Sequence, residues 1–104
     1  MGEAVYALND APAMWAARAA RQLTRKECDI TSVDCAPDIG AALRADNQIQ
    51  ASASQDPYMI AQKAVEIGQD VLNGKKPAQP MVLLPSVLLT RTTIKDYKGW
   101  STPR

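Results

Sequence analysis

Apolar and polar positions change their spacing several times along the chain, and each change predicts a new element. Apolar residues are nearly continuous over residues 4–8, which predicts a strand buried on both faces. They then recur three and four residues apart from Ala13 to Leu23, which predicts a helix with one apolar face. Residues 30–33 and 39–45 repeat this strand-then-helix pattern. The first half of the chain is therefore predicted to run β-α-β-α.

The segment 49–58 contains the clearest junction between a strand and a helix. Small and apolar residues alternate with polar ones up to Gln55, which predicts a strand. Asp56 is then a suitable N-cap, and Pro57 fits the first helical position, where its missing N–H costs nothing. The helix is predicted to run to Asn73, with Gly74 as its C′ glycine.

The last third of the chain contains two further apolar segments and a polar tail. Residues 81–84 and 87–90 are predicted strand segments, and Pro85 between them excludes one uninterrupted central strand. In the tail, residues 92–100, an apolar or aromatic side chain at every third position predicts one or two helical turns docked on the body. The order β-α-β-α-β-α-β predicts an α/β fold with a mostly parallel sheet flanked by helices.

Composition and charge limit the classes of function. The 104 residues suffice for one small domain. The net charge of +1 indicates neither a nucleic-acid partner nor a polybasic membrane patch. No apolar run is long enough to span a bilayer. The start, Met1-Gly2-Glu3, lacks the basic and apolar regions of a secretory signal and leads at once into a strand, so we expect a piece of a longer protein.

The two cysteines, Cys28 and Cys35, bracket the second predicted strand. An extended separation of this length is roughly 23 Å, whereas a disulfide needs Cα atoms within about 7 Å. Two free thiols are therefore predicted. The chain has no His and no third thiol, so no metal site is predicted.

Three polar residues follow successive predicted strands: Asn9, Asp34 and Gln55. The carboxyl ends of parallel strands meet at one edge of a sheet, which is where ligands bind in open α/β folds. Two amides and a carboxylate suit a polyhydroxylated ligand, because each hydroxyl both donates and accepts a hydrogen bond. Such a site rejects analogues that lack the hydroxyl, since its polar groups are then left unpaired.

Each of these residues also has a purely structural interpretation. Asn9 can cap the following helix, Asp34 can form a turn, and Gln55 can be a solvated strand end. The two tryptophans, Trp15 and Trp100, are candidate stacking platforms for a sugar but are more typical of packing anchors.

The sequence contains no recognisable catalytic motif. The chain has no His, no G-x-S-x-G elbow, no P-loop and no G-x-G-x-x-G. Asp10, Asp34 and Asp56 offer carboxylates, but no spacing selects a pair among them. The sequence therefore predicts neither an enzyme nor a bound cofactor.

Four stretches, taken in order, resemble the final third of periplasmic sugar-binding proteins of the ribose-binding type. They are residues 5–13 (VYALNDAPA), 29–38 (DITSVDCAPD), 51–58 (ASASQDPY) and 84–90 (LPSVLLT). This family provides the solute receptors of ATP-driven sugar importers, and its fold is shared with effector domains of the lac-repressor family. The resemblance covers nearly the whole chain.

The resemblance implies a partial type I periplasmic-binding-protein fold, whose two α/β lobes close over a sugar at a hinge. Residues 1–55 would then be a C-terminal-lobe segment that ends in a hinge strand. Residues 56–85 would supply a helix and a strand to the other lobe, and residues 86–104 would be the return strand and tail.

The resemblance also assigns roles residue by residue. Asn9, Asp34 and Gln55 would contact the hydroxyls of a monosaccharide or a similar polyol. The family usually has Gly where Ser32 stands and often has Gly where Cys35 stands. This chain therefore departs from the family pattern on both sides of Asp34.

The predicted function is that of a fragment of a periplasmic, non-enzymatic sugar receptor that delivers its ligand to a membrane permease. The alternatives are the effector-binding domain of a lac-repressor-family regulator and a stand-alone α/β interaction module. With half of the clamp absent, this chain alone is expected to bind sugar weakly or not at all. Apolar surface meant for the other lobe would be uncovered, which predicts self-association.

Overall fold

The computed structural model describes residues 3–102. The first two residues of the predicted segment 1–55 and the last two of the predicted segment 86–104 lie outside the described residues. The described elements follow the order that the sequence predicts. They are β1 (Glu3–Tyr6), α1 (Asp10–Gln22), β2 (Cys28–Asp34), α2 (Pro37–Arg44), β3 (Ile49–Ser54), α3 (Pro57–Leu72), β4 (Val87–Thr90) and the 3-10 turn η1 (Ile94–Asp96).

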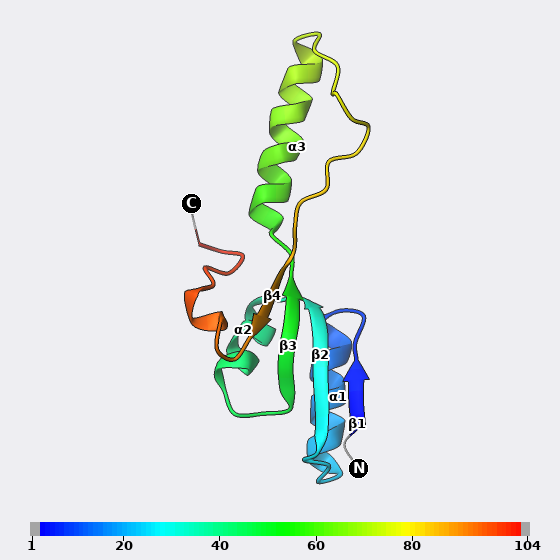
Figure 1. Cartoon of the computed structure of the whole chain (residues 1–104), viewed down its shortest axis with the longest axis vertical. Helices are drawn as coiled ribbons and strands as arrows, with labels where there is room; N and C mark the ends of the chain where they lie inside the picture. The colour runs from blue at the N-terminus through cyan, green and yellow to red at the C-terminus, as the bar shows by residue number, and fades with distance from the viewer. Residues whose placement is uncertain (1–2, 103–104) are drawn as a thin grey trace.

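The four strands form one sheet in the order β1-β2-β3-β4. β1, β2 and β3 run parallel, and β4 is antiparallel to β3 (Figure 1). The predicted α/β class and the mostly parallel sheet are confirmed. β4 begins after Pro85 and lies at an edge, where a preceding proline removes no central hydrogen bond.

Both α1 and α2 lie behind the sheet in Figure 1, and they contact each other as well as β2 and β3. Two successive β-α-β crossovers of the same hand that advance in one direction place their helices on one face. The core lies between that face and the two helices. Its largest fully buried side chains are Ile30, Ile39, Leu43, Ile49 and Ile94. Ile94 comes from η1, so the predicted docking of the tail on the body is confirmed.

A register shift between Ile30 and Thr31 shapes the centre of the sheet. Ile30 pairs with Ile49, whereas Thr31 pairs with Ala51, so Gln50 is passed over. An extra residue of this kind changes which side chains face inward. Ile49 and Ser52 are consequently both buried, although strict alternation would place them on opposite faces.

The prediction that the first strand is buried on both faces is wrong. β1 is an edge strand, and the helices cover only one face of the sheet at this point. Tyr6 is 73% exposed, and Ala4 is exposed as well. An apolar run is typical of a central parallel strand, but it does not report the position of the strand in the sheet.

Helix α3 projects away from the sheet as an arm, and none of its residues is buried (Figure 1). Its ends match the sequence prediction. The Asp56 carboxylate accepts a hydrogen bond from the Met59 N–H at 3.1 Å, and Pro57 follows it at the first position. At the other end Gly74 has a φ of 81°, and the Gly74 and Lys75 N–H groups bond back into the last turn, which makes a Schellman motif.

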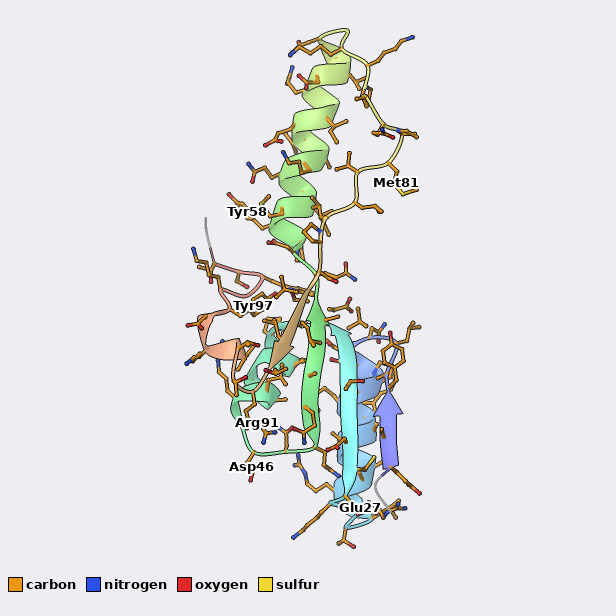
Figure 2. The ribbon with its side chains drawn as sticks, viewed as in Figure 1. Glu27, Asp46, Tyr58, Met81, Arg91 and Tyr97 are labelled. Atoms are coloured by element: carbon orange, nitrogen blue, oxygen red, sulfur yellow. The ribbon has the colours of Figure 1, made fainter. Side chains whose placement is uncertain are left out.

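The returning segment differs from the prediction. Residues 81–84 form no strand, although their composition is strand-like. A strand needs a neighbour for its backbone hydrogen bonds, and this segment runs beside α3 rather than beside a strand (Figure 2 labels Met81 there). The side chains of Met81, Val82 and Leu83 remain exposed, as do several on α3.

The separation of a packed body from an exposed arm predicts a contrast between two leucines. Leu43→Ala should lower the free energy of unfolding by about 2–5 kcal/mol, because Leu43 is 0% exposed and leaves a cavity. Leu72→Ala is the matched control at the end of α3, where Leu72 is 83% exposed. This substitution should change the free energy of unfolding by less than about 0.5 kcal/mol. Urea unfolding followed by circular dichroism measures both, and equal effects would contradict this division.

Candidate functional site at the carboxyl edge of the sheet

The structure brings Asp34 and Gln55 together. Gln55 Nε2 donates to Asp34 Oδ1 at 2.6 Å, and the Gln55 N–H donates to the Asp34 carbonyl at 3.0 Å. The cause is the parallel register of β2 and β3, in which Asp34 pairs with Ser54. Both strands therefore end at the same edge. The result is an amide and a carboxylate held side by side on a surface open to solvent.

Asn9 lies at the end of the neighbouring strand. It occupies the N-cap position of α1 with an extended backbone, but its side chain makes no capping hydrogen bond. The side chain is exposed, and within residues 3–102 no hydrogen bond joins it to Asp34 or Gln55. The structure thus places Asn9 on the expected edge, outside the contact that joins the other two residues.

The turn that follows β2 has an unusual backbone. Asp34 has a φ of 107° and Cys35 a φ of 53°, and neither is a glycine. Left-handed conformations of non-glycine residues cost on the order of 1–3 kcal/mol each and persist only where surrounding contacts hold them. The positive φ of Cys35 gives a physical reason for the glycine that the resemblance expects there.

Two aromatic side chains of the tail, Trp100 and Tyr97, contact this edge. Trp100 Nε1 donates to the Asp34 carbonyl at 3.2 Å, and the Tyr97 hydroxyl donates to the Gln55 carbonyl at 3.4 Å. The structure therefore supports the anchoring interpretation of Trp100, because its indole N–H is bonded to the backbone. Trp15 is 69% exposed on α1.

Asp10 was missed as a structural contact by the sequence analysis. It is 8% exposed, and its Oδ2 accepts a hydrogen bond from the Ala36 N–H at 2.6 Å. Its Oδ1 and the Ser32 hydroxyl are buried without a hydrogen-bond partner in the described part of the chain. Burial raises the pKa of the Asp10 carboxyl, which the Ala36 N–H opposes and the Asp34 charge reinforces. No local spacing signals this contact, because it spans 26 residues.

Two hollows flank the edge. One of about 230 Å³ lies between Cys35, Gly40 and the tail residues 97–102, and another of about 530 Å³ lies between Ser54, Leu89 and Tyr97. Tail residues line both hollows, whereas Asn9 and Asp34 line neither. The edge itself is an open surface.

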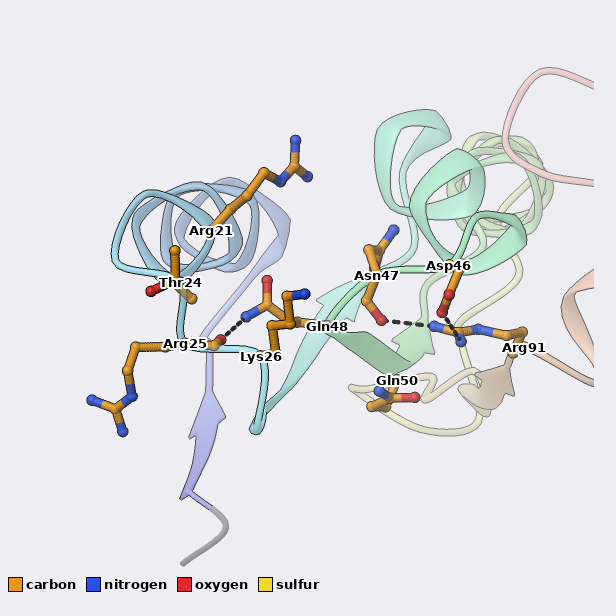
Figure 3. A pocket seen from close by; sticks show the side chains of 10 residues that line it. Arg21, Thr24, Arg25, Lys26, Asp46, Asn47, Gln48, Gln50 and Arg91 are labelled. Atoms are coloured by element: carbon orange, nitrogen blue, oxygen red, sulfur yellow. Dashed lines mark hydrogen bonds and ion pairs between the residues drawn. The ribbon is translucent and has the colours of Figure 1, made fainter.

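A further hollow of about 540 Å³ lies at the opposite end of the sheet (Figure 3). Four cationic side chains line it, but two of them are already paired. Arg25 forms ion pairs with Glu3 and Glu27, and Arg91 pairs with Asp46 at 3.2 Å. The sequence gives no signal for this hollow, and ion pairs within the chain neutralise two of its four cations, Arg25 and Arg91.

No cluster of metal-binding side chains and no membrane-spanning helix stands out in the described structure. Residues 3–102 contain no group of three or more His, Cys, Asp or Glu side chains able to hold a metal ion. No helix in the same range is long and apolar enough to cross a membrane. Cys28 and Cys35 are both free and buried, so the prediction of two free thiols is confirmed.

Comparison with known proteins gives one family and a set of similar structures. The model of a family described as a periplasmic binding protein domain matches residues 3–76. No curated protein sequence matches the chain. An ABC sugar transporter subunit from Rhodobacter sphaeroides 2.4.1 superimposes with a TM-score of 0.77 and 27% identity. That match covers 85% of this chain and 31% of the other.

Two further structures are similar. The periplasmic binding protein of the arabinose ABC transporter from Shewanella sp. ANA-3, bound to α- and β-L-arabinofuranose, has a TM-score of 0.79 and 26% identity, over 90% of this chain and 32% of its own. A solute-binding protein from Agrobacterium vitis with bound allitol has a TM-score of 0.80 at 20% identity, over 90% of this chain and 32% of its own. At this identity the match supports the fold alone. The chain thus spans about a third of the length of the structures it matches.

The buried thiols lead to a prediction about reactivity. Burial raises the pKa of Cys35 to about 11, with the Asp10 charge adding to the effect and Arg44 opposing it. Only about one thiol in a thousand is then ionised at pH 8, and the thiolate is the reactive form. In a Cys28→Ser variant, Cys35 should react with Ellman's reagent at least about 100-fold more slowly in the folded protein than in guanidinium. Comparable rates in the two conditions would contradict the buried placement.

Proposed function

The chain belongs to the periplasmic binding protein family, and we propose that it is the C-terminal portion of a sugar receptor of an ATP-driven importer. Two relatives above 25% identity, the Rhodobacter and Shewanella proteins, are ABC sugar-transport proteins. The family is generally non-enzymatic and suggests a location outside the cytoplasm, so the proposed role is recognition and delivery rather than catalysis. The permease of the importer is the proposed protein partner.

The contact between Asp34 and Gln55 is the observation that carries this proposal. With Gln55 Nε2 bound to Asp34 Oδ1, the carboxylate and the amide are oriented before any ligand arrives. Asp34 Oδ2 and Gln55 Oε1 remain as acceptors, and Gln55 retains a second amide N–H as a donor. Together with the exposed amide of Asn9, this set matches the mixed donors and acceptors of adjacent sugar hydroxyls.

The proposed ligand is a monosaccharide or a similar polyol. The Shewanella relative holds a pentose in its furanose form. Asn9, Asp34 and Gln55 supply two amides and one carboxylate, and they offer no unpaired cation for an acidic ligand. A neutral, hydroxyl-rich molecule is therefore the class that this edge suits best.

The shape of the molecule supports the proposed division of the chain. Residues 1–55 belong to one lobe, residues 56–85 reach into the other, and residues 86–104 return to the first. α3 leaves the sheet directly after Gln55, and the chain comes back beside that point before β4 (Figure 1). The exposed apolar side chains of α3 and of residues 81–84 suit burial in a second lobe. Hinge closure would then bring that lobe over the edge.

The proposal predicts weak, site-specific binding by this chain alone. Pentoses and hexoses including L-arabinose should shift the side-chain amide signals of Asn9 and Gln55 in nitrogen–proton NMR, with a Kd weaker than about 1 mM. The binding is weak because one lobe supplies only part of the contacts. Asp34→Asn should abolish the shifts by replacing an acceptor oxygen with a donor.

The matched control is Asp29→Asn, which changes an exposed aspartate at the other end of β2 and should leave the shifts intact. Binding tighter than about 10 µM by this chain alone would contradict the idea of half a clamp. Absence of any shift at the highest soluble sugar concentration would contradict the sugar contacts themselves.

The uncovered apolar arm predicts reversible self-association. Sedimentation velocity should show a species larger than the monomer that dissociates on dilution. Leu83→Gln removes a side chain that is 81% exposed on the returning segment and should weaken association by about tenfold. Leu23→Gln, at the exposed end of α1 and 70% exposed, is the control and should have little effect. A wild-type monomer that persists at all concentrations would overturn this prediction.

A further inference from the structure

The turn that carries Asp34 is held by a side chain from another part of the chain. Asp10, the first residue of α1, reaches across to the Ala36 N–H at the start of α2, 26 residues away. This contact joins the chain that leaves β1 to the chain that leaves β2. It therefore connects two neighbouring positions on the proposed binding edge.

We propose that Asp10 is the positioning residue of this edge, and that its carboxylate holds the Asp34–Cys35 turn in the left-handed conformation in which Asp34 meets Gln55. The consequence for sugar binding rests on the proposed function. The consequence for the geometry of the turn does not, and it can be measured without any sugar.

The backbone of the turn shows why such a contact is needed. Asp34 and Cys35 are consecutive residues with positive φ, and both carry side chains. The upstream side is fixed, because the Asp34 carbonyl accepts hydrogen bonds from the Gln55 N–H and from Trp100 Nε1. On the downstream side the Ala36 N–H is bonded to Asp10. Removal of Asp10 would leave the Ala36 N–H without its acceptor. Asp34 and Cys35 would then be held from the upstream side alone, through the hydrogen bonds to the Asp34 carbonyl.

The placement of Asp10 also explains why Asn9 faces outward. Successive residues of an extended backbone point their side chains in opposite directions. Asn9 has an extended backbone and is exposed, while Asp10 is buried. One dipeptide thus supplies an outward amide to the proposed edge and an inward acceptor to the neighbouring turn.

The surroundings of Asp10 set what a conservative substitution must keep. The titratable groups that face it are the Asp34 carboxyl and the Cys35 thiol, and the Ser32 hydroxyl lies beside it. Burial and the Asp34 charge disfavour a negative charge on Asp10. The Ala36 N–H needs only an acceptor oxygen, so the useful property is that oxygen rather than the charge. Asp10→Asn keeps that oxygen, whereas Asp10→Ala removes it.

The indole N–H of Trp100 is a direct reporter of this turn, because it is bonded to the Asp34 carbonyl. In the full chain, Asp10→Ala should accelerate hydrogen exchange of the Trp100 indole by about tenfold, as expected for loss of one buried hydrogen bond. The indole of Trp15, which is exposed on α1, is the internal control and should not change. Asp10→Asn and the exposed-site control Asp38→Ala should stay within about twofold of the wild type.

A double variant separates positioning from general stabilisation. Glycine adopts positive φ without strain, so Cys35→Gly should remove most of the effect of Asp10→Ala on Trp100 exchange. A role in overall folding would give no such rescue, because Cys35→Gly also removes a buried side chain. If Asp10→Ala fails to fold, the Asp10→Ala/Cys35→Gly variant should fold, and its failure to do so would overturn the proposal.

The remaining outcomes distinguish this inference from the proposed function. Unchanged Trp100 exchange in a folded Asp10→Ala variant would overturn the positioning role. Titration with L-arabinose tests the consequence for sugar binding. The shift of the Gln55 amide signal should be lost in Asp10→Ala and kept in Asp10→Asn. If the wild type shows no shift with any sugar, the proposed function fails while the indole result still decides the role of Asp10.

Discussion

The parallel pairing of β2 with β3 is the constraint on which the candidate site depends. Because Asp34 pairs with Ser54, the next residue, Gln55, emerges beside Asp34 and continues the ladder with its N–H. A slip of one residue would turn every inward side chain outward and would separate the carboxylate from the amide. The register shift between Ile30 and Thr31, at which Gln50 of β3 is passed over, belongs to the same pairing. It aligns the ends of the two strands.

This pairing is supported by a core that occupies one face of the sheet. α1, α2 and η1 supply the cover, and the buried side chains are mostly aliphatic. The arm formed by α3 adds none to that core, which is why the molecule measures 59 Å along its longest axis and only 18 Å along its shortest. Stability and proposed binding contacts therefore reside in the body, while the arm presents apolar surface.

The strained turn after β2 lies at the candidate binding edge. Local rules favour glycine at Cys35, yet the chain keeps a buried side chain there. Conformations of this kind are typical of sites where surrounding contacts, and not local propensity, define the backbone. Here the contacts come from three separate elements: α1 through Asp10, the strand end through Gln55, and the tail through Trp100.

The sequence by itself determined the order of the elements, the caps of α3 and the separation of the two thiols. These features depend on residues at most a few positions apart, so the spacing of apolar side chains, Asp56 and Gly74 was enough to predict them. The carboxyl-edge positions of Asp34 and Gln55 were also predictable, because parallel strands end together.

Only the tertiary structure decided the rest. β1 is exposed because it lies at an edge, and residues 81–84 form no strand because no neighbour pairs with them. The bond from Asp10 to Ala36 exists because two strand ends 26 residues apart lie side by side. Apolar spacing reports which way a side chain faces within its own element, but burial and pairing depend on which elements become neighbours.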